Sequence, residues 1–184
     1  MSFASNLNIL ISVYPIMESL LKFAAIDIGS NAVRLLLSGV LEESYSATFR
    51  KMSLIRMPIR LGDDAFTQKH ISDSKVSQLV KSMIGFKHLI EAFQPLDMMA
   101  CATSAMREAE NGPEICNRIL TEADIKVEII DGVREAQFIF ENKSADLFGG
   151  NDAYLYVDIG GGSTEITLFS RGQIMTTGSF NIGT

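Results

Sequence analysis

Residues 25–35 read AIDIGSNAVRL and residues 156–166 read YVDIGGGSTEI, so the same pattern occurs twice in the chain. Each copy is an apolar strand that ends in Asp-Ile-Gly, followed by a turn of small or polar residues and a second apolar strand. Glycine-rich turns let backbone N–H groups approach and bind phosphate oxygens. An aspartate at the end of a strand can hold a divalent cation or its water. Two such hairpins that face each other predict a clamp around a phosphate chain.

The composition limits the class of protein. A chain of 184 residues can form one domain, or one domain and part of another. Its 47% hydrophobic residues supply a packed core and argue against disorder over the whole chain. A formal net charge of −6 argues against general binding to nucleic acids or membrane surfaces, which need a basic surface. A polyanionic substrate remains compatible with this charge, because local arginines and a metal ion can offset it.

The cysteines and the N-terminal segment indicate the cellular compartment in which the protein is expected to lie. Cys101 and Cys116 are the two cysteines, and with His70 and His88 they match no zinc-binding spacing, so we expect two buried small side chains. The apolar stretch 7–16 has no preceding Lys or Arg and is too short to cross a membrane, so we interpret it neither as a signal peptide nor as a membrane span. These features predict a protein of the reducing cytoplasm.

The start of the chain allows two interpretations. Met17 lies shortly before the first predicted strand, and we expect it to be the functional start. Residues 1–16 are then an extension. The alternative is a short N-terminal helix that packs on the domain.

Hydrophobic periodicity predicts strands and helices along the rest of the chain. Strands are expected at residues 23–28, 33–40, 45–53, 96–103, 126–130, 154–158, 164–169 and 173–178. Helices are expected over residues 73–93, from Pro113 onward and from Glu135 onward. Residues 58–66 are expected to form a loop, and residues 149–152 a linker.

The order of these elements predicts an α/β fold with a mixed sheet and helices on its faces. Residues 17–148 would form a first half-domain that contains the first phosphate loop. Residues 153–184 repeat the opening three-strand meander, and so would begin a second half-domain that contains the second phosphate loop. The chain stops at Thr184, where we expect that half-domain to continue.

Five motifs resemble the exopolyphosphatase / guanosine pentaphosphate phosphohydrolase family, in family order and with family-like spacing. They are residues 25–31 (AIDIGSN), 60–62 (RLG), 102–107 (ATSAMR), 132–136 (GVREA) and 158–165 (DIGGGSTE). The resemblance implies the ribonuclease-H-like (actin-like ATPase) fold, in which two half-domains close over phosphates. It implies Mg²⁺-dependent removal of terminal phosphate from inorganic polyphosphate or guanosine pentaphosphate. It gives no role to nucleic acids or membranes, and we expect the full-length protein to be a homodimer.

The resemblance also implies roles for particular residues. The residues expected to bind phosphate are Gly29, Ser30, Asn31, Arg107, Gly160, Gly161, Gly162, Ser163 and Thr164. A guanidinium at a strand-to-helix corner can hold phosphate through two hydrogen bonds, although a surface arginine is the alternative for Arg107. Asp158 would help to hold Mg²⁺, with Asp27 close by, whereas a single strand-end aspartate is often only a turn former.

Glu135 and Glu165 are the candidate catalytic acids and bases. Hydrolysis of a phosphoanhydride needs an aligned water and a group that accepts its proton. From sequence alone, Glu135 is explained by favourable charge at a helix N-terminus, and Glu165 by a solvent-facing strand position. The resemblance assigns Glu135 to positioning or activating the water, and Glu165 to a second carboxylate near the water or the metal.

Three residues depart from the family pattern. Ala32 stands where a serine hydroxyl is common, Gln137 where a basic residue is frequent, and Arg134 where an acid is frequent. The last two exchange charge near the expected site, so we expect them to affect substrate length or affinity.

Two alternatives compete with the hydrolase. One is a nucleotide-dependent kinase of the same fold, and the other is a non-catalytic phosphate-binding module, against which the two glutamates argue. We also expect this chain alone to be far less active than the complete protein. It should self-associate through the meander, which has no helix of its own to cover one face.

Overall fold

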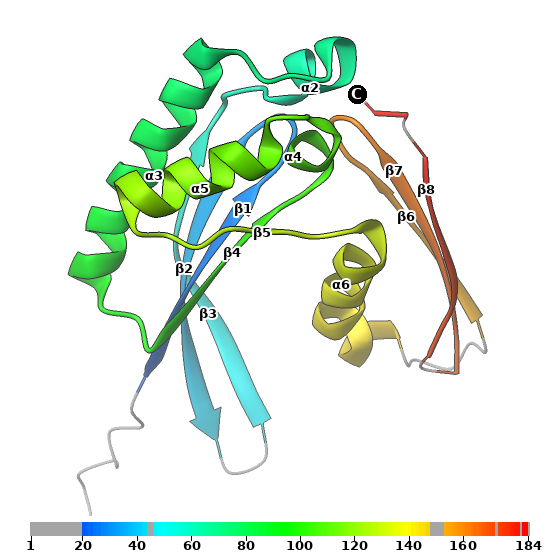
Figure 1. Cartoon of the computed structure of the whole chain (residues 1–184). Helices are drawn as coiled ribbons and strands as arrows, with labels where there is room; N and C mark the ends of the chain where they lie inside the picture. Colours follow the sequence, from blue (N-terminus) through cyan, green and yellow to red (C-terminus); the bar gives the residue numbers. More distant parts are fainter. Residues whose placement is uncertain (1–19, 44–45, 148–152, 172, 181, 184) are drawn as a thin grey trace, which may run out of the picture.

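The computed structural model describes residues 20–43, 46–147, 153–171, 173–180 and 182–183 (Figure 1). The predicted extension at residues 1–16, the predicted start at Met17 and the predicted linker at residues 149–152 lie outside the described residues. Among the described residues, no helix is both long and apolar enough to cross a membrane.

The larger sheet has five strands. They are β1 (Leu21–Ile28), β2 (Val33–Glu43), β3 (Ser46–Met57), β4 (Asp97–Ala102) and β5 (Glu128–Ile129), in the spatial order β3-β2-β1-β4-β5. Strand β2 is antiparallel to both β1 and β3, whereas β4 is parallel to both β1 and β5. The expected mixed sheet is therefore confirmed, with the opening meander on one side and the crossover strands on the other.

Five helices are described: α2 (Gly62–Gln68), α3 (Asp73–Phe93), α4 (Ser104–Glu108), α5 (Gly112–Ala123) and α6 (Gly132–Leu147). Helices α3 and α5 pack together over one face of the larger sheet (Figure 1). Ala24, Ile26 and Ile28 of β1 are buried on this face, because alternate residues of a strand point the same way. The predicted apolar face of α3 is buried against them, so burial of apolar area stabilises this layer.

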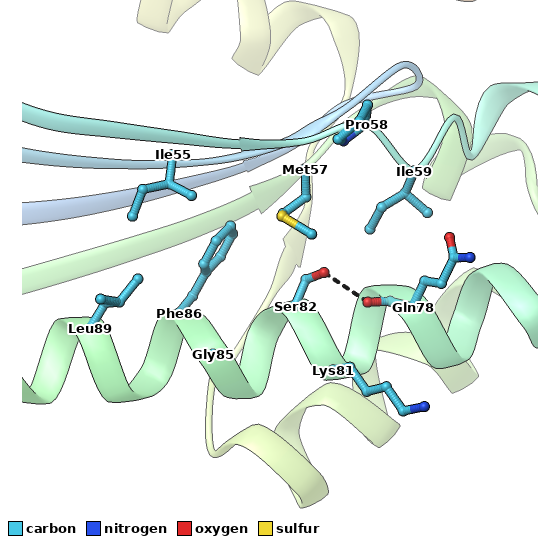
Figure 2. Close-up of a pocket in the computed structure, with 10 residues that line it drawn as sticks. All are labelled: Ile55, Met57, Pro58, Ile59, Gln78, Lys81, Ser82, Gly85, Phe86 and Leu89. Carbon is cyan, nitrogen blue, oxygen red and sulfur yellow. Dashed lines mark hydrogen bonds between the residues drawn. The ribbon is translucent and has the colours of Figure 1, made fainter.

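An open apolar groove runs between α3 and the edge strand β3. Figure 2 shows Phe86 and Leu89 of α3 pointing toward Ile55 and Met57 of β3. The groove has a volume of about 510 Å³. It lies on the face that α3 covers, because Ile55 packs against the buried core.

The smaller sheet consists of β6 (Ala153–Ile159), β7 (Thr164–Ser170) and β8 (Gln173–Phe180), paired antiparallel in that order. Helix α6, which precedes this meander in the chain, packs against β7 and β8 and covers one of its faces (Figure 1). The opposite face stays open, and Leu155 and Ile159 are 65% and 62% exposed there.

The prediction of a loop at residues 58–66 is wrong, because α2 begins at Gly62. Its Asp64 carboxylate accepts a hydrogen bond from the Ser72 amide at 3.0 Å and pairs with Lys75 at 2.8 Å. Lys75 and the Ser72 contacts hold the pKa of Asp64 at about 2. These contacts come from outside the helix, so the local sequence does not reveal them.

Candidate active site

The two glycine-rich hairpins have the same backbone structure. The amide of Gly29 donates to the carbonyl of Ala32 at 3.1 Å, and the amide of Gly160 donates to the carbonyl of Ser163 at 2.8 Å. Each turn joins two antiparallel strands directly after its Asp-Ile pair. The repeat seen in the sequence is therefore a repeat in three dimensions.

Both turns line one cavity of about 280 Å³. The predicted residues that line it are Asp27, Gly29, Ser30, Asn31, Glu135, Asp158, Gly160, Gly161, Ser163 and Glu165. Arg107, Gly162 and Thr164 are not among its lining residues. The cavity also includes Arg34, Thr103 and Ser104, which sequence reasoning did not select. The structure thus brings most of the predicted phosphate, acid and metal residues to one place.

The three consecutive glycines of the second turn allow it to approach the first half of the chain. A Cβ atom at Gly161 would lie 2.5 Å from the side chain of Asn31. A Cβ atom at Gly162 would overlap the ring of Phe66, on α2. A side chain at either position would force its neighbour to move. Gly161 therefore lets the second turn approach the first turn, and Gly162 lets it pack on α2.

Two other motifs, residues 60–62 and 102–107, hold the first turn in place. The Ser30 hydroxyl is buried and lies 2.9 Å from the Ser104 hydroxyl of α4. The carbonyl of Ser30 accepts from the amide of Gly62 at 2.9 Å, and the carbonyl of Asn31 accepts from the amide of Arg60 at 3.2 Å. Buried polar groups need such partners. These contacts position the turn, so the Ser30 hydroxyl has a structural partner in addition to its predicted phosphate role.

The two strand-end aspartates have opposite electrostatic surroundings. Asp27 lies directly across the ladder from Arg34, and their side chains form an ion pair at 2.7 Å. Asp158 lies across from Glu165 at the equivalent position of the second hairpin. Aligning the two sequence copies places Arg34 where the second copy has Glu165, and this alignment was the signal that could have revealed Arg34.

Arg107 contacts the backbone that leads into α6. Its Nη1 donates to the carbonyl of Ile130 at 2.9 Å, two residues before α6 begins. Its charge also lowers the pKa of Glu135. The structure therefore places Arg107 beside the catalytic candidate, where it holds the start of α6. Its predicted contact with phosphate stays a prediction.

Glu135 lies in the first turn of α6, half-buried at the cavity wall. The pKa of this carboxyl is raised to about 7, chiefly by burial and then by the nearby carboxylates Glu165, Asp158 and Asp27, whereas Arg107 opposes the shift. Its Oε2 atom is buried without a hydrogen-bond partner among the described residues. A glutamate that only complements the charge of a helix N-terminus can stay exposed, so that role does not explain the burial of Glu135. An unpaired, buried carboxylate oxygen with a pKa near neutrality is suited to accept a proton.

The pKa of Glu135 has a consequence for stability that can be measured. Because the folded pKa is raised from the ordinary 4.5 to about 7, the group favours the folded state below pH 4.5, and this contribution is lost as the pH rises toward 7. We expect Glu135→Gln to raise the melting temperature at pH 8 by roughly 2–6 °C, after allowance for partial exposure. Thermal unfolding at pH 4.5 should show little difference. A variant that is less stable at pH 8 would contradict the raised pKa.

Glu165 is buried, with 3% of its surface exposed, so the solvent-facing alternative is wrong. The hydroxyl of Ser179 donates to its Oε1 at 3.0 Å. Thr164, by contrast, donates its hydroxyl to the carbonyl of Ile182 at 2.6 Å. The contact of Thr164 joins the second turn to the segment after β8.

The carboxylates of the cavity fit a magnesium ion that also takes ligands from water and phosphate. Asp158 and Glu165 are directly opposite on neighbouring strands, and like charges in that arrangement are destabilising unless a cation offsets them. Among the described residues, no three His, Cys, Asp or Glu side chains form a group that could hold an ion alone. Mg²⁺ is commonly bound through one or two carboxylates, with waters and substrate phosphates as the other ligands. Asp158 and Glu165 match this donor set, whereas Asp27 is already paired with Arg34.

Solved structures of the Ppx/GppA family and of exopolyphosphatases resemble this chain. The chain has a TM-score of 0.75 and 25% identity to an Aquifex aeolicus member of the Ppx/GppA family, over 89% of this chain and 52% of that one. It has a TM-score of 0.78 and 27% identity to an exopolyphosphatase from Cytophaga hutchinsonii, over 88% of this chain and 51% of that one. The chain therefore spans about half the length of these structures, and its fold is the expected actin-like one.

Sequence comparison agrees. A bifunctional 3-dehydroquinate synthase/phosphatase from Fusobacterium nucleatum is 31% identical over 164 residues, which cover 87% of this chain and 25% of that protein. The model of the Ppx/GppA phosphatase family matches residues 40–184, most of the chain. Together with the two matching hairpins around one acidic cavity, this match shows that the chain belongs to the Ppx/GppA phosphatase family.

Proposed function

We propose that this chain forms the phosphate-binding half of a hydrolase that removes terminal phosphate from inorganic polyphosphate or guanosine pentaphosphate. The observation that carries the proposal is the position of Glu135, whose unpaired carboxylate oxygen is buried at the wall of a cavity that both glycine-rich turns line. The enzyme would depend on Mg²⁺, and we expect a cytoplasmic homodimer for the full-length protein. The family match and the exopolyphosphatase neighbours support this type of reaction.

The positions of these residues suggest which step of the reaction each of them performs. The two turns bind the phosphate oxygens and fix the terminal group. A water molecule attacks the terminal phosphorus while the bridging P–O bond breaks, and the remaining chain leaves with the bond's electron pair. Glu135 accepts the proton of that water, because its pKa of about 7 leaves it largely deprotonated just above neutrality. Products are inorganic phosphate and a chain that is one phosphate shorter.

Asp158 and Glu165 would hold the magnesium ion, which when bound neutralises charge on the phosphate oxygens. We expect Asp158→Ala to raise the Mg²⁺ concentration for half-maximal activity by about tenfold or more, since one of few carboxylate ligands is lost. A magnesium titration of phosphate release checks this result. Asp97→Ala is the matched control, because Asp97 is exposed and does not line the cavity. An unchanged titration for Asp158→Ala would limit that residue to a role in the turn.

One experiment separates this function from its alternatives. Phosphate release from long-chain polyphosphate and from guanosine pentaphosphate should be measured side by side on the full-length protein. A hydrolase releases phosphate to water, whereas a kinase needs a second acceptor and a binding module releases none. Phosphate release from neither compound would contradict the proposal.

A further inference from the structure

A line of charged residues crosses the larger sheet at the level of the cavity. The strand register places Asp27 of β1 opposite Arg34 of β2, and Arg34 opposite Arg56 of β3. Directly opposite residues point to the same face, with Cβ atoms about 4.5–5.5 Å apart. Asp27 and Arg34 line the cavity, so Arg56 lies one strand beyond it, at the edge of the sheet.

The charges of this line do not balance. Asp27 pairs with Arg34 at 2.7 Å, and this leaves Arg56 as a second cation beside an arginine. The side chain of Arg56 is exposed and makes no hydrogen bond or ion pair with any residue that the structure describes. Two like charges directly opposite on a sheet are destabilising. A bound anion would remove this cost, and two arginines on neighbouring strands can offer several donors to the oxygens of a phosphate chain.

The cavity itself is too small for the whole substrate. Its volume of about 280 Å³ lies just below the range of pockets that enclose a drug-sized ligand, about 300–1,000 Å³. A phosphate chain whose terminal group lies between the turns must therefore continue outside. The wall around Asp158, Glu165 and Glu135 is acidic, and these carboxylates are assigned to the metal and the water, so this wall offers the rest of the chain no cationic side chain. Arg134, on α6, is engaged with the ring of Phe138 at 4.6 Å.

We propose that Arg34 and Arg56 form an anion subsite for phosphate groups behind the scissile bond, with Arg56 as the residue that sets affinity for longer chains. This subsite rests on the proposed function, since it takes a chain whose end lies in the cavity. Its ligand is a linear phosphoanhydride chain, which polyphosphate and guanosine pentaphosphate both present. Arg56 contacts the part of the substrate that does not react, so it contributes equally before and during the reaction.

The test is a comparison of Arg56→Ala with Arg50→Ala in the full-length protein. Arg50 is exposed on the same strand, but it lies opposite Gly39 and hence on the other face of the sheet. We expect Arg56→Ala to raise the KM for long-chain polyphosphate about three- to tenfold at low salt, with kcat unchanged. Arg56→Lys should recover part of the affinity, and Arg50→Ala should match the wild type. The difference should shrink at high salt because the contact is ionic.

The same variants also distinguish between the two possible substrates, and between a binding role and a structural role of Arg56. Tripolyphosphate, long-chain polyphosphate and guanosine pentaphosphate are compared, and a larger effect on one of the latter two identifies the source of the chain. Because Arg56 is exposed beside another arginine, we expect Arg56→Ala to melt at the wild-type temperature or above it. A lower melting temperature with an unchanged KM would show a structural role and overturn the subsite.

Binding is measured as well, so that failure of the subsite is distinct from failure of the enzyme function. Fluorescence anisotropy of end-labelled polyphosphate reports affinity even if no phosphate is released. Equal affinity of the wild type and Arg56→Ala, or no binding to the wild type, overturns the subsite. Loss of affinity in Arg134→Ala but not in Arg56→Ala would direct the chain along α6 and overturn it too.

Discussion

Replacing Glu135 with glutamine is expected to lower kcat for phosphate release by about 10²–10⁴, because the variant keeps the shape of the side chain and loses the proton acceptor. Binding of the substrate should hold or improve, since one negative charge leaves a cavity that also contains Asp158 and Glu165. The measurements are steady-state phosphate release and direct polyphosphate binding on the full-length protein. Activity within twofold of the parent would end the assignment of Glu135 as the base.

The pH profile gives an independent check of the same residue. The raised pKa of Glu135, about 7, means that the wild-type rate should rise with pH as the carboxyl loses its proton through that value. The Glu135→Gln variant should lose this limb of the profile. Glu141→Gln is a suitable control, because Glu141 lies on the same helix with an exposed side chain. A control that loses the limb as well would point to another titrating group.

Gly162→Ala is expected to disrupt the second turn. The new Cβ atom would overlap two ring atoms of Phe66, and the backbone of Gly162 also lies close to Gly183. Overpacking of this kind costs about 1–3 kcal/mol. We expect a lower melting temperature and at least a tenfold loss of activity, because the turn can no longer close on the first half of the chain.

Gly161→Ala is the matched comparison, because its Cβ would meet only the tip of the Asn31 side chain, which can move aside. It should therefore be milder than Gly162→Ala. A smaller side chain at position 66 should leave room for the new Cβ atom. Gly162→Ala is therefore expected to lower the melting temperature less in a Phe66→Leu background than in the wild type. If the melting temperature falls equally in both backgrounds, the ring of Phe66 is not the obstacle.

The sequence was sufficient for elements that short-range patterns specify. The helix at residues 73–93 was predicted with the bounds that α3 has, because its apolar residues recur at helical spacing and Pro95 follows it. The two hairpins were predicted because glycine-rich turns between apolar strands form locally. The repeat also predicted that both turns would belong to one site, and the cavity that they line is consistent with this prediction.

Elements stabilised by distant partners were missed or misjudged. Helix α2 depends on Asp64, whose partners Ser72 and Lys75 lie beyond the helix. The cover over the small sheet comes from α6, which was assigned only to the first half-domain. Glu165 gave no sign in the sequence that it would be buried, since burial depends on what packs on its strand.

For the site, the sequence alone predicted most of the residues that line the cavity, and the tertiary structure decided their electrostatic surroundings. Asp27 and Asp158 occupy the same place in two copies of one motif, yet an arginine lies across from one and a glutamate from the other. The raised pKa of Glu135 likewise arises from burial and from carboxylates far away in sequence. A local pattern fixes the identity of a group, but its charge state depends on neighbours that only folding brings within a few ångströms.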